Sequence, residues 1–183
     1  MKWSLPLLLL LSSLASSGQK TPAPSGFTGG VEADVLPFLT GGYYMSVWGG
    51  YKHVRYRIVL TEVNTPQFLL PEKFSNNEIE AYALIADYFF HRDFQGCWIG
   101  TGLEWWKGQI DTRDASATGR YTAYLYTIGT GYVWNIYRGF YLNPWAGAHL
   151  KVGGDHFAHV GLLEYTPPLL TPEVSFKIGW HFQ

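Results

Sequence analysis

Ser175, Glu173 and His149 are the residues of this chain with the clearest potential for catalysis. Ser175 and Glu173 lie two positions apart in the closing segment EVSFKIGWHFQ, and His149 belongs to a preceding segment that could lie beside it. A serine hydroxyl becomes a nucleophile when a base lies next to it, so these three side chains together could support hydrolysis. A serine on an inward face can equally fill space. The elements that position the three residues decide between these roles.

Asp155, His156 and His159 form a second candidate cluster, within the segment GGDHFAHVGLLEYTPPLLTP at 153–172. Two histidines at His-x-x-His spacing with a neighbouring aspartate could hold a metal ion, but no fourth ligand is evident. We therefore interpret them as solvated loop residues and predict no metal site and no other cofactor. The segment is unusually apolar, which favours folding over the neighbouring elements or contact with a partner. Its large apolar residues are Leu162, Leu163, Tyr165, Leu169 and Leu170.

Strict alternation marks the last eleven residues, where every second residue from Val174 to Phe182 is apolar and those between are polar or small. Successive side chains of a β-strand point to opposite faces, so this segment predicts a strand with one apolar and one polar face. Similar patterns predict strands at 51–63, 78–90, 97–110, 121–134 and 140–152. These segments are near or above the ~9–11 residues with which a tilted strand crosses a bilayer.

The bulk of the aromatic residues predicts which face meets the surroundings. An eight-stranded barrel has an interior just wide enough to be filled by side chains, and the Tyr, Trp and Phe residues of the apolar faces would not all fit inside. We therefore expect the aromatic faces to point outward into lipid and the glycine-rich, charged faces to point inward. Trp98 and Trp106 interrupt this pattern. The predicted inward charged residues are His53, Arg55, Arg57, Asp87, Glu104, His149, Lys151, Glu173, Lys177 and His181.

Both signs of charge occur in this inward set, and buried charges must be paired. The structural interpretation is a network of salt bridges and hydrogen bonds that fills the lumen. The alternative is a constricted, charged pathway for ions or small solutes.

The overall composition bounds the class of protein. The chain has 183 residues, a formal net charge of −1 and 15% charged residues, which suits one domain. Lysines and arginines do not cluster, so nucleic acid is not an expected partner. Cys97 is the only cysteine, which excludes an internal disulfide.

The opening MKWSLPLLLLLSSLASSGQK combines a basic residue, a short apolar stretch and small residues. This combination is typical of a secretory signal peptide, which we place at 1–18. Residues 19–30 are rich in Pro, Gly, Ser and Thr and predict a flexible leader, so the barrel is assigned to 31–183.

Six strands are clear, and closure into a barrel of the usual minimum size requires two more from residues 28–49. An alternative is one long strand at 43–63 preceded by a helical plug at 32–39. Ser75-x-x-Glu78 also matches a helix capping box, so a helix at 76–88 is a further alternative. The connections 91–96 and 135–139 are short, whereas 64–77, 111–120 and 153–172 are longer. Short turns usually face the periplasm and long loops face outward.

The signal-like opening, the long alternating strands and the terminal alternation ending at Phe182 resemble small outer-membrane β-barrel proteins of Gram-negative bacteria. The stretches GFYLNPWAG and EVSFKIGWHF look like barrels of Bacteroidota-type bacteria. The resemblance implies a position in the outer membrane, contact with its lipid, and recognition of the C-terminal strand by the outer-membrane insertion machinery. Small barrels that modify lipid A place Ser, His and an acid near the outer rim, but their His-x-Ser arrangement is missing here.

We therefore predict an exported, antiparallel transmembrane β-barrel of eight strands in the outer membrane, with a filled polar lumen and a structural or surface-interaction role. The alternatives are a narrow solute or ion pore and a lipid-modifying enzyme. No enzyme activity and no catalytic residue are assigned. The sequence predicts neither a substrate nor an oligomeric state.

Overall fold

The structure, a computed structural model, describes residues 26–182. The predicted signal peptide at 1–18 lies outside the described residues, as does the greater part of the leader predicted at 19–30. The first strand begins at Thr28, so the barrel starts within the predicted leader rather than at residue 31.

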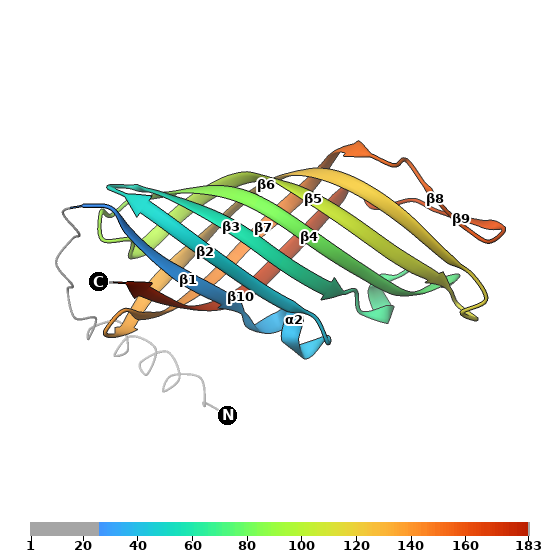
Figure 1. Cartoon of the computed structure of the whole chain (residues 1–183), viewed down its shortest axis with the longest axis horizontal. Helices are drawn as coiled ribbons and strands as arrows, with labels where there is room; N and C mark the ends of the chain where they lie inside the picture. The colour runs from blue at the N-terminus through green and yellow to red at the C-terminus, as the bar shows by residue number, and fades with distance from the viewer. Residues whose placement is uncertain (1–25, 183) are drawn as a thin grey trace, which may run out of the picture.

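Eight antiparallel strands close into a barrel in the order β1-β10-β7-β6-β5-β4-β3-β2, with β1 joined to β2 to complete the ring (Figure 1). This confirms the predicted all-β class and the predicted number of strands. The strands of the ring are β1 (Thr28–Asp34), β2 (Tyr43–Tyr51), β3 (Val54–Asn64), β4 (Phe74–Phe89), β5 (Gly96–Thr112), β6 (Thr118–Tyr137), β7 (Phe140–Gly154) and β10 (Leu170–Phe182).

Residues 28–49 supply two strands, as the closure argument requires. Between β1 and β2 lies the five-residue helix α2 (Val35–Leu39), whose N-cap Asp34 accepts a hydrogen bond from the backbone N–H of Leu36. The alternative of one long strand at 43–63 is wrong, because the chain turns at Lys52 and His53 between β2 and β3. Within residues 26–182, no helix has the length and apolar character needed to span a bilayer.

The alternative helix at 76–88 is wrong, because β4 runs without a break from Phe74 to Phe89. Ser75 does not cap a helix; its hydroxyl donates to the carbonyl of Thr112 on β5. The pairing of β4 with β5 shifts register between Ser75 and Glu78, which marks a bulge. Pairing with strands on both sides outweighs the local preference for a helix start.

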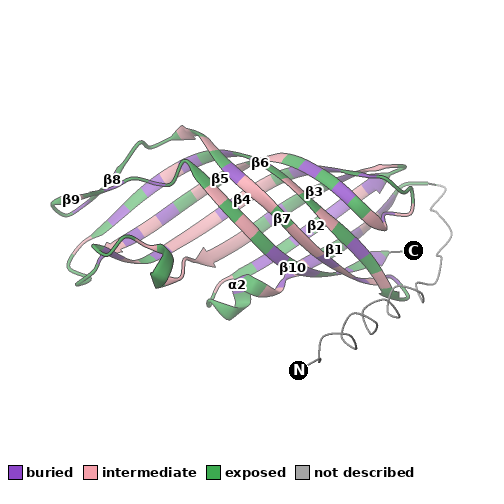
Figure 2. Cartoon of the chain, turned by 180° about the vertical axis from the view of Figure 1, so that it is seen from behind, coloured by how far each residue is buried: buried purple, intermediate pink, exposed green. Residues whose placement is uncertain are grey.

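The two faces of the strands differ in exposure, most clearly in β2, β6 and β10 (Figure 2). In β10, Val174 is 71% exposed and Phe182 is 56% exposed, whereas Lys177 between them is 1% exposed. The same alternation holds in β3, where Tyr56 and Ile58 are exposed. The prediction that the aromatic and aliphatic faces point outward is therefore confirmed.

The barrel has two unlike ends. The terminal end carries both chain ends of the barrel and the connections 52–53, 90–95 and 138–139. The last of these, Arg138-Gly139, has positive φ at both residues, as in the two-residue turns that suit the twist of a hairpin. The loop end carries 35–42, 65–73, 113–117 and 155–169.

The wall is uneven in height, because β1 and β2 have 7 and 9 residues whereas β5 and β6 have 17 and 20 (Figure 1). Because β5 and β6 are longer than expected, the connection between them, predicted at 111–120, is shortened to 113–117. At the loop end, β8 (Ala158–Val160) and β9 (Leu163–Tyr165) form a separate hairpin. Its residues pack against the interior of the tall wall in one apolar cluster, made of Phe74, Ile110, Tyr121, Ala158, Val160 and Tyr165.

Candidate functional site in the barrel lumen

An ion-pair network crosses the terminal half of the lumen. Arg55 and Asp87 face each other in the register of β3 and β4, and Arg55 Nε donates to Asp87 Oδ2 at 2.8 Å. Arg57 holds the same carboxylate with two nitrogens, at 2.7 and 2.9 Å. The second carboxylate comes from β1, where Glu32 Oε1 lies 2.9 Å from an Arg55 nitrogen. All four side chains are buried. The two positive charges of Arg55 and Arg57 are therefore balanced inside the barrel by the two negative charges of Asp87 and Glu32.

Uncharged side chains extend this network across the barrel. Glu32 Oε1 also accepts hydrogen bonds from Tyr141 Oη and Asn143 Nδ2, at 3.0 and 2.9 Å. Two indole groups complete the layer, because Trp48 donates to Tyr141 Oη and Trp98 donates to Asn143 Oδ1. A carboxylate from β1 is thus joined to strands on the far side of the ring.

Aromatic rings enclose the arginines. The guanidinium carbon of Arg55 lies 4.9 Å from the centroid of Phe89 and 5.5 Å from that of Trp48. Phe94, from the connection 90–95, turns into the barrel with a φ of 55° and packs against both rings. These buried side chains occupy the axis of the terminal half, so the lumen is filled there. The cluster consists of Trp48, Phe89, Phe94, Trp98, Val133 and Tyr141.

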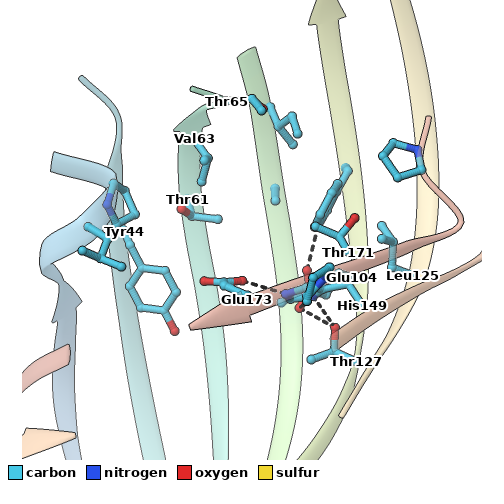
Figure 3. A pocket seen from close by; sticks show the side chains of 18 of the residues that line it. Tyr44, Thr61, Val63, Thr65, Glu104, Leu125, Thr127, His149, Thr171 and Glu173 are labelled. Carbon is cyan, nitrogen blue, oxygen red and sulfur yellow. Dashed lines mark hydrogen bonds and ion pairs between the residues drawn. The ribbon is translucent and has the colours of Figure 1, made fainter. Parts of the chain in front are cut away.

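A second polar group lies nearer the loop end (Figure 3). His149 Nε2 is 2.6 Å from Glu173 Oε2, while His149 Nδ1 is 2.7 Å from Thr127 Oγ1 and 3.2 Å from Glu104 Oε1. Glu104 accepts further hydrogen bonds from Thr127 and from the indole of Trp106. Both ring nitrogens of the histidine therefore have partners on neighbouring strands.

Ser175 is not part of this second group. Its hydroxyl donates to Asp34 Oδ2 at the end of β1, whereas the partners of His149 are Glu104, Thr127 and Glu173. The residues considered for hydrolysis therefore do not form a serine–histidine pair in this structure. Their geometry supports a structural role for Ser175, in holding β10 to β1.

Lys177 lies between the two groups and is 1% exposed. Its Nζ is 4.2 Å from the ring centroid of Trp145 and 4.8 Å from that of Tyr44. The ammonium group thus lies against two aromatic faces, which attract a cation.

A cavity of about 760 Å³ occupies the loop half of the lumen, above Lys177 and Arg57. This corrects the expectation of a lumen filled along its whole length. The polar residues Glu104, His149 and Glu173 lie on one side, and the remaining wall is mainly apolar because β3, β4 and β6 turn small or aliphatic residues inward there. These apolar residues include Val59, Ile79, Ala81, Ala83, Ile85, Ala123 and Leu125.

The ten residues predicted to face inward do not form one network. Arg55, Arg57 and Asp87 meet in the terminal half; Glu104, His149 and Glu173 meet in the loop half; and Lys177 lies between them. His181 lies near the terminal end, where its Nε2 is 2.6 Å from Thr28 Oγ1.

His53 and Lys151 lie apart from these groups. His53 stacks on Tyr88 at a turn, with Nδ1 2.8 Å from the carbonyl of Phe89. Lys151, near the loop end, donates to the carbonyl of Asp155.

Several important lumen residues are absent from the predicted set. Glu32 and Asp34 lie within residues 28–49, where the sequence did not indicate which residues of a strand face inward and which face outward. Trp98 and Trp106 did give a signal, because they interrupt the outward aromatic pattern, and both donate to inward polar groups. Their indole nitrogen explains why these large rings point inward.

In the loop at 153–172, His159 is exposed and lies 3.9 Å from Glu164 across the small hairpin. Asp155 Oδ2 accepts a hydrogen bond from the backbone of Thr122. Among residues 26–182, no group of three His, Cys, Asp or Glu side chains is arranged to hold a metal ion.

The fold and the lumen together define a small antiparallel β-barrel with a band of exposed apolar side chains outside and a buried network of paired charges inside. The chain is similar in fold to the crystal structure of Neisserial surface protein A, with a TM-score of 0.53 and 12% sequence identity over 86% of this chain and 98% of that chain. At this identity the likeness concerns the fold alone. No family model matches the chain, and no curated protein matches its sequence.

Proposed function

We propose that this protein is an integral outer-membrane β-barrel of a Gram-negative, Bacteroidota-type bacterium. In this proposal, the segment 1–18 directs export, and the barrel has a structural or surface-interaction role. The observation that carries the proposal is a band of exposed aliphatic and aromatic side chains around the ring, which includes Val47, Ile58, Leu84, Leu103 and Ile128. The exposed charged side chains of Glu80 and Lys107 lie beyond this band, toward the loop end. Where neighbouring strands pair on both sides, as they do around most of the ring, the backbone hydrogen bonds are satisfied internally, which allows such an exterior to lie in hydrocarbon.

The distribution of aromatic residues supports this placement. Trp134 and Tyr137 are exposed near the terminal end of β6, and Trp105 is exposed toward the loop end of β5. Trp and Tyr are enriched where a membrane protein crosses the two interfaces. Lys107 lies 4.5 Å above the ring of Trp105, as expected for a cation reaching toward head groups.

We further propose that the terminal end faces the periplasm and the loop end faces outward, following the usual positions of short and long connections. β10, which ends in an exposed Phe182, is then the segment offered to the insertion machinery. The hairpin of β8 and β9 becomes the most prominent surface feature.

The filled terminal half argues against the alternative of a solute or ion pore. We expect the reconstituted full-length protein to give no steady openings in a planar bilayer, because paired charges and aromatic rings occupy the axis. A wide porin in the same bilayer provides the positive control. Reproducible single-channel currents would refute the proposed closed state.

The alternative of a lipid-modifying enzyme lacks its central contact, because Ser175 bonds Asp34 instead of His149. Membrane location itself is tested by fractionation followed by heat-modifiable migration on a gel. We expect the protein in the outer-membrane fraction, migrating differently before and after boiling. Recovery in the soluble periplasmic fraction would contradict the proposal.

A further inference from the structure

The barrel wall has an opening in its loop half. β1 ends at Asp34, whose partner on β10 is Lys177, and its pairing with β2 ends at Ala33 and Met45. β10 continues from Lys177 toward the loop end as far as Leu170, and on that stretch it is paired with β7 alone. The place of the missing strand is taken by α2 (Figure 1).

The depth of this opening follows from the length of β1. Its 7 residues are fewer than the ~9–11 with which a tilted strand crosses a bilayer. At ~3.3 Å per residue and a ~45° tilt, β1 rises by roughly 16 Å, whereas the apolar band of such barrels is ~25 Å tall. In the proposed orientation, the opening therefore lies at the level of the outer leaflet.

The residues beside the opening suit contact with lipid. α2 has the sequence VLPFL, with Phe38 and Leu39 exposed. On the opposite edge, Val174 and Leu170 of β10 are also exposed.

The internal cavity reaches this opening. Its lining combines Val59 and Leu125, which face the lumen, with Leu36 and Leu39 of α2 and with Val174. Val174 is on the outward face of β10, so it can border an internal cavity only where the wall is interrupted. The cavity and the lipid-facing surface are thus continuous at this point.

The chemistry of the cavity favours a hydrocarbon chain. Its volume of about 760 Å³ is within the range of ~300–1,000 Å³ typical of pockets for small molecules. Ala81, Ala83 and Ala123 create the space along the apolar wall. Glu104 and His149 already bond each other and their neighbours, so they do not require a polar ligand. If the cavity were empty, the apolar side chains that line it would lack van der Waals contacts on that side, and a hydrocarbon chain would restore those contacts.

The loop end offers a second route. Phe74, Tyr121 and Tyr165 pack together on one side of the mouth, where β8 and β9 fold against the tall wall, but the cavity lining also reaches Pro66 and Pro168 of the loop-end connections. The opening beside α2 is bordered by exposed aliphatic residues and therefore suits entry from lipid.

We propose that the loop half of the lumen accepts one acyl chain of an outer-leaflet lipid, which enters between α2 and β10. This inference rests on the proposed membrane location. The chain lies against Val59, Ala83 and Leu125, and the head group stays in the bilayer interface. The protein is then a lipid-binding barrel with a lateral entrance.

Photo-crosslinking tests this proposal. The full-length protein is reconstituted into phosphatidylcholine vesicles that contain a diacyl phosphatidylcholine with a diazirine midway along one chain, and adducts are mapped by mass spectrometry after irradiation. We expect adducts on the lumen-facing Val59, Ala83 and Leu125 as well as on the lipid-facing Ile58 and Leu84. Heat-modifiable migration establishes folding in each sample.

Two substitutions on opposite faces of β4 provide a matched pair. Ala83→Phe fills the cavity and is expected to abolish the adducts at Val59 and Leu125 while those at Ile58 and Leu84 persist. Ala86→Phe, on the outward face of the same strand, should leave the lumen adducts unchanged.

Three outcomes would overturn the inference in distinguishable ways. Adducts on the exterior alone would refute acyl-chain binding while the membrane location stands. Lumen adducts obtained only with a single-chain diazirine lysolipid added from water would refute the lateral entrance. A folded protein without adducts on either face would refute both the inference and the proposed membrane location.

Discussion

Asp87→Ala is expected to destabilise the barrel by about 3–5 kcal/mol, the usual cost of breaking a buried ion pair by removing one partner. Asp87 accepts hydrogen bonds from Arg55 and from two nitrogens of Arg57, and all three side chains are buried. Its removal leaves two guanidinium groups with Glu32 as the remaining carboxylate partner. Urea unfolding in lipid vesicles, followed by tryptophan fluorescence, measures the change.

Glu72→Ala is the matched control for this substitution. Glu72 is an exposed acid in the connection between β3 and β4, so its removal should change the free energy of unfolding by less than about 0.5 kcal/mol. Equal stability of the Asp87→Ala and Glu72→Ala proteins would show that the ion-pair network does not hold the terminal half together.

Leu84→Arg is expected to cost about 2–4 kcal/mol in a bilayer, the penalty for an arginine near the midplane on the lipid face of a barrel. Leu84 is 59% exposed and lies between Ile58 of β3 and Leu103 of β5 in the middle of the wall. A guanidinium group placed there would have to enter hydrocarbon or deform the bilayer. The free energy of unfolding in vesicles is again the measured quantity.

Two further substitutions isolate the effect of charge. Leu84→Ala removes the same side chain without adding a charge and should cost less than Leu84→Arg. Leu162→Arg places the charge on a fully exposed residue of the turn between β8 and β9 and should be nearly neutral. If arginine were tolerated equally at positions 84 and 162, the exterior of the barrel would not be in contact with lipid.

The last strand illustrates how much the local sequence decides. The alternation from Val174 to Phe182 indicates two faces, and a narrow lumen cannot hold the aromatic rings of all the alternating strands, so most of them must point outward even though a few, such as Trp48 and Trp98, fill the terminal half. Both conclusions agree with the exposure of Val174 and the burial of Lys177. Parity along a strand is a local property, because each side chain points opposite to its neighbours whatever the rest of the chain does.

The short strand β1 shows where local reasoning ends. Its 7 residues, TGGVEAD, place Glu32 and Asp34 inward, but glycines and a following proline obscure the pattern. The position of this strand between β10 and β2 depends on ring closure, which joins residues more than a hundred positions apart. The sequence therefore predicted that two strands must arise from 28–49 without identifying their inward charges.

By itself, the sequence determined the β class, the outward direction of the aromatic faces and the inward direction of most of the charges on the long strands, because these follow from period and volume. Only the tertiary structure decided which charged side chains form ion pairs and that Ser175 donates its hydrogen bond to Asp34. It also decided that the terminal half of the lumen is filled whereas the loop half contains a cavity. Those features depend on register and on the unequal heights of strands around the ring, since register determines which inward residues from distant segments share a level.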